Sequence, residues 1–354
     1  MIKTLLSLLS VLVLVISSCE NIADPGTHTF TTSGVYVINE GSFGSGNGDI
    51  SFFGVDSQGV TNNLSFSAND FSAGDVVQDM LIHDTLAVVV VNNSNKIRVF
   101  KLNTFQWIKD ITIEQPRYIV KVSDSLAYVS SWLGQIRILN LSAMEFTGTI
   151  DVGDGPEGMA VAGNEVLVAI SPGNDYVNNT NSVKVIRTSD HAVIKTIRVG
   201  WNPLQLAYSK DDYRVYVACA GKDYVMPKVP GGLYVISTAQ NGLIDSLVSL
   251  TRGVEVDSLY PGRISIQGDK GFFISGFYGA VQKFNLSSLA VEDTLAGLFY
   301  NVAVNTLDQN DPNVYCTDAT SLPGTFKIYG PTFQLLHDFT VGDFPSGIVF
   351  RNEP

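Results

Sequence analysis

The sequence is poor in charged residues. Asp, Glu, Lys and Arg together make up 16% of the 354 residues, against about 25% in typical soluble proteins. The formal net charge is −12, and no run of Lys or Arg occurs in the chain. Because phosphate groups are bound by clustered cations, the sequence argues against nucleic acid or an anionic membrane surface as a partner.

Histidine and cysteine are also scarce. The chain has four histidines, and we expect His83, His191 and His337 in turns on the face opposite the longer loops described below. This placement disfavours a histidine-ligated metal or a Ser-His-Asp triad. Cys219 and Cys316 lie in different sequence repeats, outside any CxxC or Cys/His cluster. An exported protein can pair such cysteines, but we predict two buried free thiols and no metal site.

Helical periodicity is absent outside the N-terminal segment. The chain is instead rich in glycine, with 32 residues, and in Tyr and Phe, with 14 and 19. Stretches such as "VKVIRT" and "IRILNL" alternate with a period of two, which is typical of strands. The composition therefore predicts short strands joined by tight turns.

The N-terminus carries the single long apolar run. "TLLSLLSVLVLVI" follows the basic start "MIK" and is too short to span a bilayer comfortably. Small residues then precede Cys19 in "SSC", which resembles the signal of a bacterial lipoprotein. We predict a signal peptide over 1–18, and a lipidated Cys19 with a polar tether over 19–33. Lipid chains would then hold the exported protein on a membrane surface. Glu20 and Asp24 make the tether acidic, which resembles the export signal of surface lipoproteins in Bacteroides-like bacteria, so we expect the outer membrane and exposure at the cell surface. The alternative is an ordinary signal peptide with an incidental cysteine.

Similar units repeat along the rest of the chain. They begin at Pro116, Pro156, Pro203 and Pro261, and further units cover 76–112 and 298–342. Each unit reads as four short strands separated by polar turns. Four strands in about 40–45 residues are the signature of a propeller blade.

The two ends of the repeat region complement each other. The first unit starts at Gly34 without an opening strand, and "PSGIVF" at 345–350 is an opening strand without a unit. Pairing the two would close a ring and remove two exposed sheet edges. We predict an all-β fold over 34–354. It is a seven-bladed β-propeller of four-stranded blades, closed by a C-terminal strand that completes the first blade. Eight blades are the alternative count.

The connecting loops are unequal. Turns between the first and second strands are short and polar, as in "AGNE" and "SKDD". Loops between the second and third strands are longer, as in "NEGSFGSGNG" and "SPGNDYVNNTN". In a propeller the longer loops share one face with the connections between blades. Long loops gathered on one face usually mark a binding face.

Aromatic, amide and cationic residues gather on this predicted face. We expect Trp132, Phe277 and Tyr278 to contact a ligand, because their loops need no aromatic filler. Aromatic residues between blades, such as Tyr118 and Phe344, are equally compatible with packing. Rings cover apolar area and amides pair with polar groups, so the set suits a large amphipathic ligand. The candidate ligand-binding residues are Phe43, Asn92, Asn93, Arg117, Tyr118, Trp132, Tyr176, Trp201, Asn202, Tyr224, Tyr260, Arg263, Phe277, Tyr278, Tyr300 and Phe344.

Candidate catalytic groups on this face are few. Glu40, Glu157, Asp175 and Asp318 are placed to reach it, but solvation or backbone capping explains each of them as well. We therefore expect a binding protein rather than an enzyme, with no catalytic residues and no resident cofactor.

The units resemble the YVTN/YncE-like propeller repeats. "VYVINEGSFGSGNGDISFF", near the start of the first unit, resembles the opening blade of exported Bacteroidetes lipoproteins, including the vitamin B12-binding BtuG family. This resemblance covers nearly the whole chain after the signal. It implies a corrinoid (vitamin B12) ligand, a TonB-dependent outer-membrane transporter as partner, and a monomer apart from that transporter. The alternatives are an adhesive or protein-interaction propeller, and a propeller hydrolase or lactonase with a central calcium.

Overall fold

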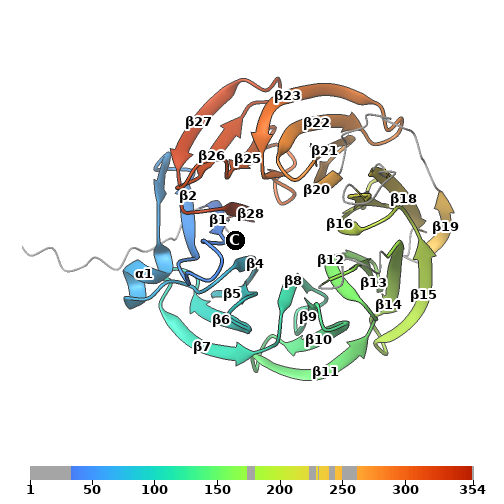
Figure 1. Ribbon diagram of the computed structural model, residues 1–354, viewed down its shortest axis with the longest axis horizontal. Helices are drawn as coiled ribbons and strands as arrows, with labels where there is room; N and C mark the ends of the chain where they lie inside the picture. The colour runs from blue at the N-terminus through green and yellow to red at the C-terminus, as the bar shows by residue number, and fades with distance from the viewer. Residues whose placement is uncertain are drawn as a thin grey trace, which may run out of the picture.

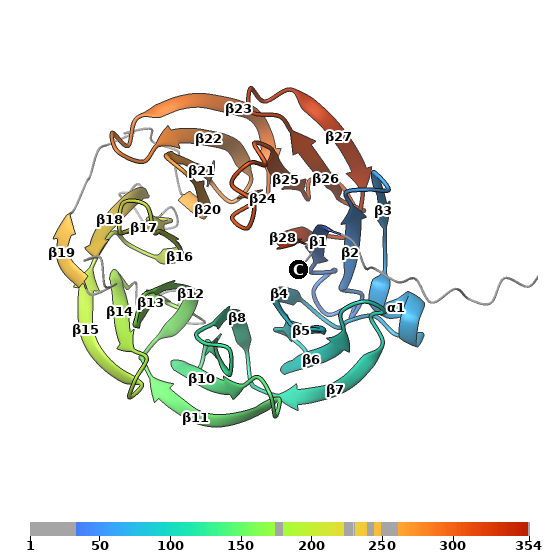
Figure 2. The same cartoon turned by 180° about the vertical axis from the view of Figure 1, so that it is seen from behind.

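The fold is a closed ring of seven four-stranded antiparallel sheets (Figures 1 and 2). The computed structural model describes residues 33–173, 180–222, 229, 231–238 and 262–352, and the backbone of 244–248 and 261. The prediction of an all-β, seven-bladed propeller is confirmed. Both views show the blades surrounding a central axis, with one strand of each blade next to that axis.

The strands fall into four classes by their distance from the axis. The innermost strands are β28 (Pro345–Arg351), β4 (Val77–His83), β8 (Pro116–Lys121), β12 (Gly155–Ala162), β16 (Pro203–Ser209), β20 (Pro261–Gln267) and β24 (Asn301–Val304). The second strands are β1 (Gly34–Asn39), β5 (Leu86–Val91), β9 (Leu126–Ser131), β13 (Glu165–Ser171), β17 (Arg214–Cys219), β21 (Lys270–Ser275) and β25 (Val314–Asp318). The third strands are β2 (Asp49–Gly54), β6 (Lys96–Lys101), β10 (Gln135–Asn140), β14 (Ser182–Arg187), β18 (Gly232–Thr238), β22 (Gly279–Asn285) and β26 (Thr325–Tyr329). The outermost strands are β3 (Gly59–Thr61), β7 (Trp107–Thr112), β11 (Glu145–Asp151), β15 (Ala192–Arg198), β19 (Ile244–Val248), β23 (Val291–Phe299) and β27 (Leu335–Thr340).

The core lies between neighbouring blades. Strand β5, "LAVVVV", shows how one strand serves two interfaces. Val89 and Val91 pack toward the first blade, whereas Val88 and Val90 pack toward the third. Successive side chains of a strand point to opposite faces of its sheet. A continuous apolar run is therefore required wherever both faces of a blade are covered.

The C-terminal strand β28 closes the ring. It pairs antiparallel with β1, and Val35 and Val37 lie opposite Phe350 and Ile348. These four residues belong to the apolar cluster between the last blade and the first. The predicted closure is therefore confirmed, and it pairs what would otherwise be open strand edges.

The structure contains one helix that the sequence did not predict, because no helical periodicity occurs after the N-terminal segment. Helix α1 (Leu64–Asn69) follows the short strand β3 and lies at the outer edge of the first blade (Figure 1). The carboxylate of Asp49 on β2 accepts the backbone N–H groups of Ser65 and Phe66, at 2.8 and 3.0 Å. A tertiary acceptor thus stabilises a helix of six residues, which is too short to show a period in the sequence.

Cys219 and Cys316 are free and buried, as predicted. Cys219 ends β17, and Cys316 lies in the middle of β25. Among the residues that the structure describes, no helix is long and apolar enough to cross a membrane.

Candidate functional site

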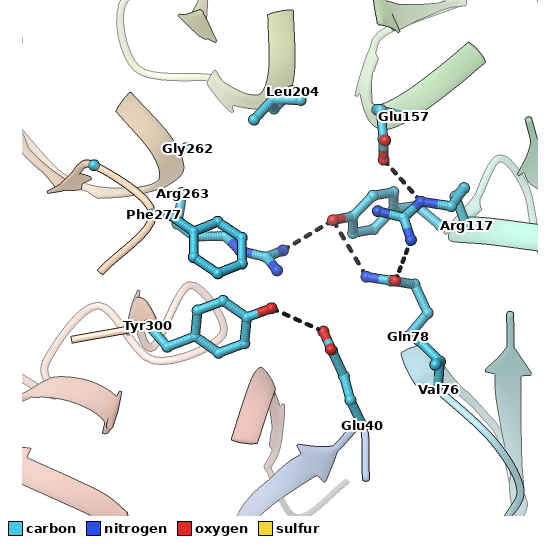
Figure 3. A pocket seen from close by; sticks show the side chains of 12 residues that line it. Glu40, Val76, Gln78, Arg117, Glu157, Leu204, Gly262, Arg263, Phe277 and Tyr300 are labelled. Carbon is cyan, nitrogen blue, oxygen red and sulfur yellow. Dashed lines mark hydrogen bonds and ion pairs between the residues drawn. The ribbon is translucent and has the colours of Figure 1, made fainter. Parts of the chain in front are cut away.

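A cavity of about 270 Å³ opens at the axis, on the face that carries the longer loops (Figure 3). Its walls come from the innermost strands, with additions from the loops between β1 and β2 and between β21 and β22. We call it the axial cavity. Its lining residues are Glu40, Val76, Gln78, Arg117, Tyr118, Glu157, Leu204, Gly262, Arg263, Gly276, Phe277 and Tyr300.

Bulges in the innermost strands aim most of these side chains at the axis. Pairing with the second strand is irregular at the start of β4, β8, β12, β16 and β20. A bulge leaves residues out of the ladder and re-aims their side chains, which is why bulges are common beside functional sites. The residues that the pairing skips and that line the cavity are Gln78, Arg117, Tyr118, Glu157, Leu204, Gly262 and Arg263.

Arg117 and Glu157 form an ion pair across two neighbouring blades. The Nε atom of Arg117 lies 3.0 Å from Oε2 of Glu157, and the two side chains are 14% and 5% exposed. A second N–H of Arg117 donates to the amide oxygen of Gln78 on the preceding blade. Burial lowers the pKa of Arg117, but the negative charges nearby, chiefly Glu157, outweigh burial and raise it above its ordinary value. The guanidinium therefore stays charged and links three innermost strands.

Trp132 completes this network. Its indole N–H donates to Oε1 of Glu157 at 2.8 Å, and the guanidinium of Arg117 stacks on its ring at 4.2 Å. The ring passes close to the backbone of Gly173, where a Cβ atom would lie 3.7 Å from it. Trp132, predicted as a ligand contact, thus has partners within the chain, and its loop positions a buried carboxylate.

A second group of aromatic residues covers the other side of the axial cavity. The ring centroids of Phe277, Tyr278 and Tyr300 lie 4.9 to 5.3 Å apart. Phe277 is 72% exposed, whereas Tyr300 is buried. Burial raises the pKa of Tyr300, so its hydroxyl is neutral and donates to Oε1 of Glu40 at 3.3 Å. The ring of Phe277 is therefore exposed to a ligand, while the ring of Tyr300 beneath it is held in place by burial and by its hydrogen bond to Glu40.

Arg263 stands between the two groups (Figure 3). One of its N–H groups donates to the hydroxyl of Tyr118 at 2.9 Å, and its guanidinium lies 5.6 Å from the ring centre of Tyr300. Among the described residues, no carboxylate lies within ion-pair distance of Arg263. The cavity therefore offers guanidinium donors and, on Glu40 and Glu157, carboxylate acceptors.

Asp79, which follows the bulge residue Gln78 on β4, was not predicted from the sequence. Its carboxylate accepts the backbone N–H groups of Met80 and Ile119, at 2.8 and 2.9 Å. Burial raises its pKa to about 6, although these hydrogen bonds and the charges of Arg263 and Arg117 oppose the rise. The sequence does contain a sign of this site, because "VQD" places two polar residues, Gln78 and Asp79, in an otherwise apolar opening strand.

The remaining predicted residues serve several purposes. The side-chain amides of Asn92 and Asn202 donate to the carbonyls of Pro116 and Gly221, at 2.9 and 2.6 Å, and so fix the backbone of the loops. The ring of Trp201 lies under Nζ of Lys222, 3.4 Å from the ring centre.

Other predicted residues lie on the loop between β1 and β2 or beside it. The amide of Asn93 donates to Asp75, which also accepts the N–H of Gly44 in this loop. Phe43 is 80% exposed at the loop tip. The carbonyl of Phe344 accepts the N–H of Glu40 at 3.0 Å. Cys19, Tyr176, Tyr224 and Tyr260, and the possible acid Asp175, lie outside the described residues.

Several of the predicted polar side chains lie away from the axial cavity. Asp318 pairs with Lys327 at 3.2 Å. His83 ends β4 and His191 precedes β15, both at turns of the opposite face, whereas His337 lies within the outer strand β27 and not in a turn. Within the described residues, no group of three or more His, Cys, Asp or Glu side chains could hold a metal ion.

Residues 33–239 match a family described as a domain of unknown function (DUF5074). The chain belongs to this family. A search of curated proteins finds no match to this DUF5074 chain.

Two solved structures show how widely the fold of this DUF5074 chain is shared. Hydrazine synthase from Kuenenia stuttgartiensis matches with a TM-score of 0.64 and 14% identity, over 80% of this chain and 90% of the other. A structure named for U3-55K matches with a TM-score of 0.57 and 14% identity, over 76% of this chain and 83% of the other. Likeness at this identity shows the fold alone. The resemblance to vitamin B12-binding propellers therefore stays a prediction.

Proposed function

We propose that this protein is a surface lipoprotein that captures a large amphipathic molecule at the mouth of the axial cavity. A corrinoid is the first candidate. The observation that carries the proposal is the convergence of bulge residues from five innermost strands on one cavity, beside the exposed ring of Phe277. Bulges that re-aim side chains are over-represented beside functional sites.

The chemistry of the mouth suits a ligand with many carboxamides. Arg263 and Tyr118 present N–H and O–H groups, while Glu40 presents carboxylate oxygens. A carboxamide both donates and accepts, so it can pair with either side of the cavity. A volume of about 270 Å³ is small for a whole corrinoid. We therefore expect the ring system to lie over the mouth on Phe277, with a side group entering the cavity.

Binding is favoured over catalysis by the state of the carboxylates. Glu157 is held by Arg117 and Trp132, and Glu40 accepts the hydroxyl of Tyr300. Both carboxylates are thus already engaged as hydrogen-bond acceptors within the protein, whereas a catalytic carboxyl group must face the substrate. A hydrolase or lactonase is accordingly the weaker alternative.

The anchor and the mouth would lie on opposite faces. Strand β1 begins at Gly34 on the face opposite the mouth and ends at Asn39 beside it. A tether over 19–33 could span roughly 50 Å when fully extended. A lipidated Cys19 would thus let the mouth meet either free ligand or a TonB-dependent transporter in the same membrane.

A protein partner is the second candidate, and exposed apolar loop tips favour it. Phe43, Leu133, Phe277 and Leu322 are 51 to 80% exposed and all lie in loops between second and third strands. They come from four blades and share the face of the mouth. Exposed apolar groups around a site are a common feature of docking surfaces. The same tips would also serve as contacts to the transporter.

The first test is to mix the purified protein with cyanocobalamin and to separate the mixture by gel filtration. Red colour that elutes with the protein supports corrinoid capture, and complete separation contradicts it. Phe277→Ala should weaken binding by about tenfold, because truncating an aromatic anchor typically costs more than 1 kcal/mol. The matched control is Leu307→Ala, since Leu307 is 60% exposed but lies in a turn of the opposite face. Equal affinities of the two variants would contradict this placement of the ligand.

A further inference from the structure

A second cavity, larger than the first, lies where the ring closes. It occupies about 640 Å³ between the first blade and the last, and it is lined from α1, from the loop between β1 and β2, and from the end of β27. We call it the seam cavity. Small-molecule sites typically enclose about 300–1,000 Å³. The seam cavity therefore has the size of a ligand site and is separate from the axial cavity.

Its lining is rich in amides and contains no cation. Asn47, Asn62, Asn63 and Asp343 contribute planar polar groups, and no Lys, Arg or His occurs among the described residues that line it. Without a cation the cavity has no charge partner for an anionic ligand. Amide and carboxylate groups instead pair with hydroxyls, which both donate and accept hydrogen bonds.

The polar groups are held in place before any ligand binds. The amide of Asn62 donates to the carbonyl of Thr340 at 3.0 Å, which joins the two blades, while its Oδ1 atom is buried without a partner. The amide of Asn47 donates to Asp343 at 3.0 Å, and its oxygen accepts the N–H of Ser42 at 2.8 Å. The buried Oδ1 atom of Asn62 is closed to a ligand, so the exposed side chains of Asn47 and Asn63 are the amides that a ligand in the cavity can meet. Fixed partners also lower the entropic cost of binding.

One aromatic ring stands at the edge of the cavity. Phe66 is 56% exposed although it lines the cavity wall. Its position is fixed because Asp49 accepts the N–H groups of Ser65 and Phe66 at the start of α1. A pyranose has one face of C–H groups and an edge of hydroxyls, so an aromatic ring beside planar amides matches both.

We propose that the seam cavity is a saccharide-binding site, with Phe66 against the apolar face of the sugar and the exposed amide of Asn63 as a hydroxyl partner. The site is distinct from the mouth of the axial cavity and does not depend on the function proposed for it. A neutral sugar unit fits the lining better than a phosphate, which needs cations. It also fits better than a cation, since Asp49 already accepts two backbone N–H groups and Asp343 already accepts the amide of Asn47.

The test is saturation-transfer NMR with the full-length protein and a panel of glucose, galactose, mannose, N-acetylglucosamine and maltose. Ethanolamine and lysine serve as cationic probes. We expect transfer to at least one saccharide and none to the cationic probes. Titration of the best saccharide should then show about tenfold weaker binding for Phe66→Ala, as for the loss of an aromatic anchor.

Two further variants locate the sugar. Thr340→Ala removes an exposed hydroxyl from the lining and should also weaken binding, while the backbone carbonyl that Asn62 uses remains. Phe43→Ala removes a more exposed ring from the neighbouring loop, outside the lining, and should leave binding unchanged. The proposal is overturned if no saccharide shows transfer, if only the cationic probes bind, or if Phe43→Ala weakens binding as much as Phe66→Ala. A sugar signal lost in Phe277→Ala but kept in Phe66→Ala would overturn it as well, because the sugar would then lie at the axial mouth.

Discussion

The indole N–H of Trp132 donates a hydrogen bond of 2.8 Å to the carboxylate of Glu157. Trp132 lies on a loop of the third blade and Glu157 on the innermost strand of the fourth, so the bond joins two blades. The carboxylate is 5% exposed and also pairs with Arg117. A buried carboxylate costs free energy unless it is hydrogen-bonded. Trp132 occupies this short loop because its indole N–H supplies the carboxylate of Glu157 with a donor in addition to Arg117.

Replacing Trp132 by Phe should destabilise the fold. The ring remains to stack on Arg117, but the buried carboxylate loses a donor, which typically costs about 1–3 kcal/mol in free energy of unfolding. Urea denaturation monitored by circular dichroism measures the loss. Trp107→Phe is the matched control, because Trp107 donates to Asp110 at 2.9 Å but is 47% exposed. A loss as large for Trp107→Phe as for Trp132→Phe would contradict the special role of burial.

Removing the charge of Glu157 should cost more. Glu157→Gln leaves the guanidinium of Arg117, 14% exposed, without its ion-pair partner. Breaking one side of a buried pair typically costs about 3–5 kcal/mol. Asp190→Asn is the control, since the pair of Asp190 with Arg187 is exposed and its loss should leave the unfolding curve almost unchanged. The prediction fails if the two substitutions have the same effect.

The carboxyl group of Asp79 predicts a specific pH dependence. Burial raises its folded pKa to about 6, above the value near 4 of an unfolded chain. The folded protein thus binds this proton more tightly, so the contribution of Asp79 to stability is present below about pH 4 and is lost as the pH rises through about 6. The loss is at most about 3 kcal/mol.

Comparison with Asp79→Asn isolates this contribution. The free energy of unfolding of the wild type, minus that of the variant, should fall between about pH 4 and pH 7. Other carboxylates, such as Asp49, titrate equally in both proteins and cancel in the difference. A difference that rises with pH would show that Arg117 and Arg263 dominate over burial and hold Asp79 ionised.

Deleting residues 345–354 should abolish folding. Without β28 the first blade loses its innermost strand, and Val35 and Val37 lose the cover of Phe350 and Ile348. The ring would also gain open strand edges, which promote aggregation. Gel filtration should show aggregates, whereas deletion of 353–354 alone should give the same elution volume as the intact protein. A monomer that still unfolds cooperatively after the longer deletion would contradict this account of closure.

The sequence alone determined the repeating part of the structure. Alternation of apolar and polar residues with a period of two, as in "VKVIRT" from Val183, is local, because it follows from the geometry of a single strand. The spacing of opening prolines and the split first unit then determined seven blades and their closure. Buried free cysteines followed from their positions in separate repeats.

The composition of the axial cavity was decided by the tertiary structure. Arg117, Tyr118, Arg263, Phe277 and Tyr300 were predicted on the correct face, but the sequence did not show that they meet Gln78 and Glu157 around one cavity. That meeting depends on bulges in the innermost strands, whose side chains are re-aimed only when the neighbouring strand is paired.

Trp132 shows the same limit for a single residue, and α1 shows it for an element. Trp132 is unusual for its short loop, which the sequence shows. Its partner Glu157, however, lies 25 positions away in the sequence and on another blade. Helix α1 likewise depends on Asp49, which lies 16 positions before Ser65. Local patterns determine which strands form, because each strand obeys its own period. Contacts between blades determine which polar groups are buried together, because only the closed ring brings those groups within hydrogen-bond distance.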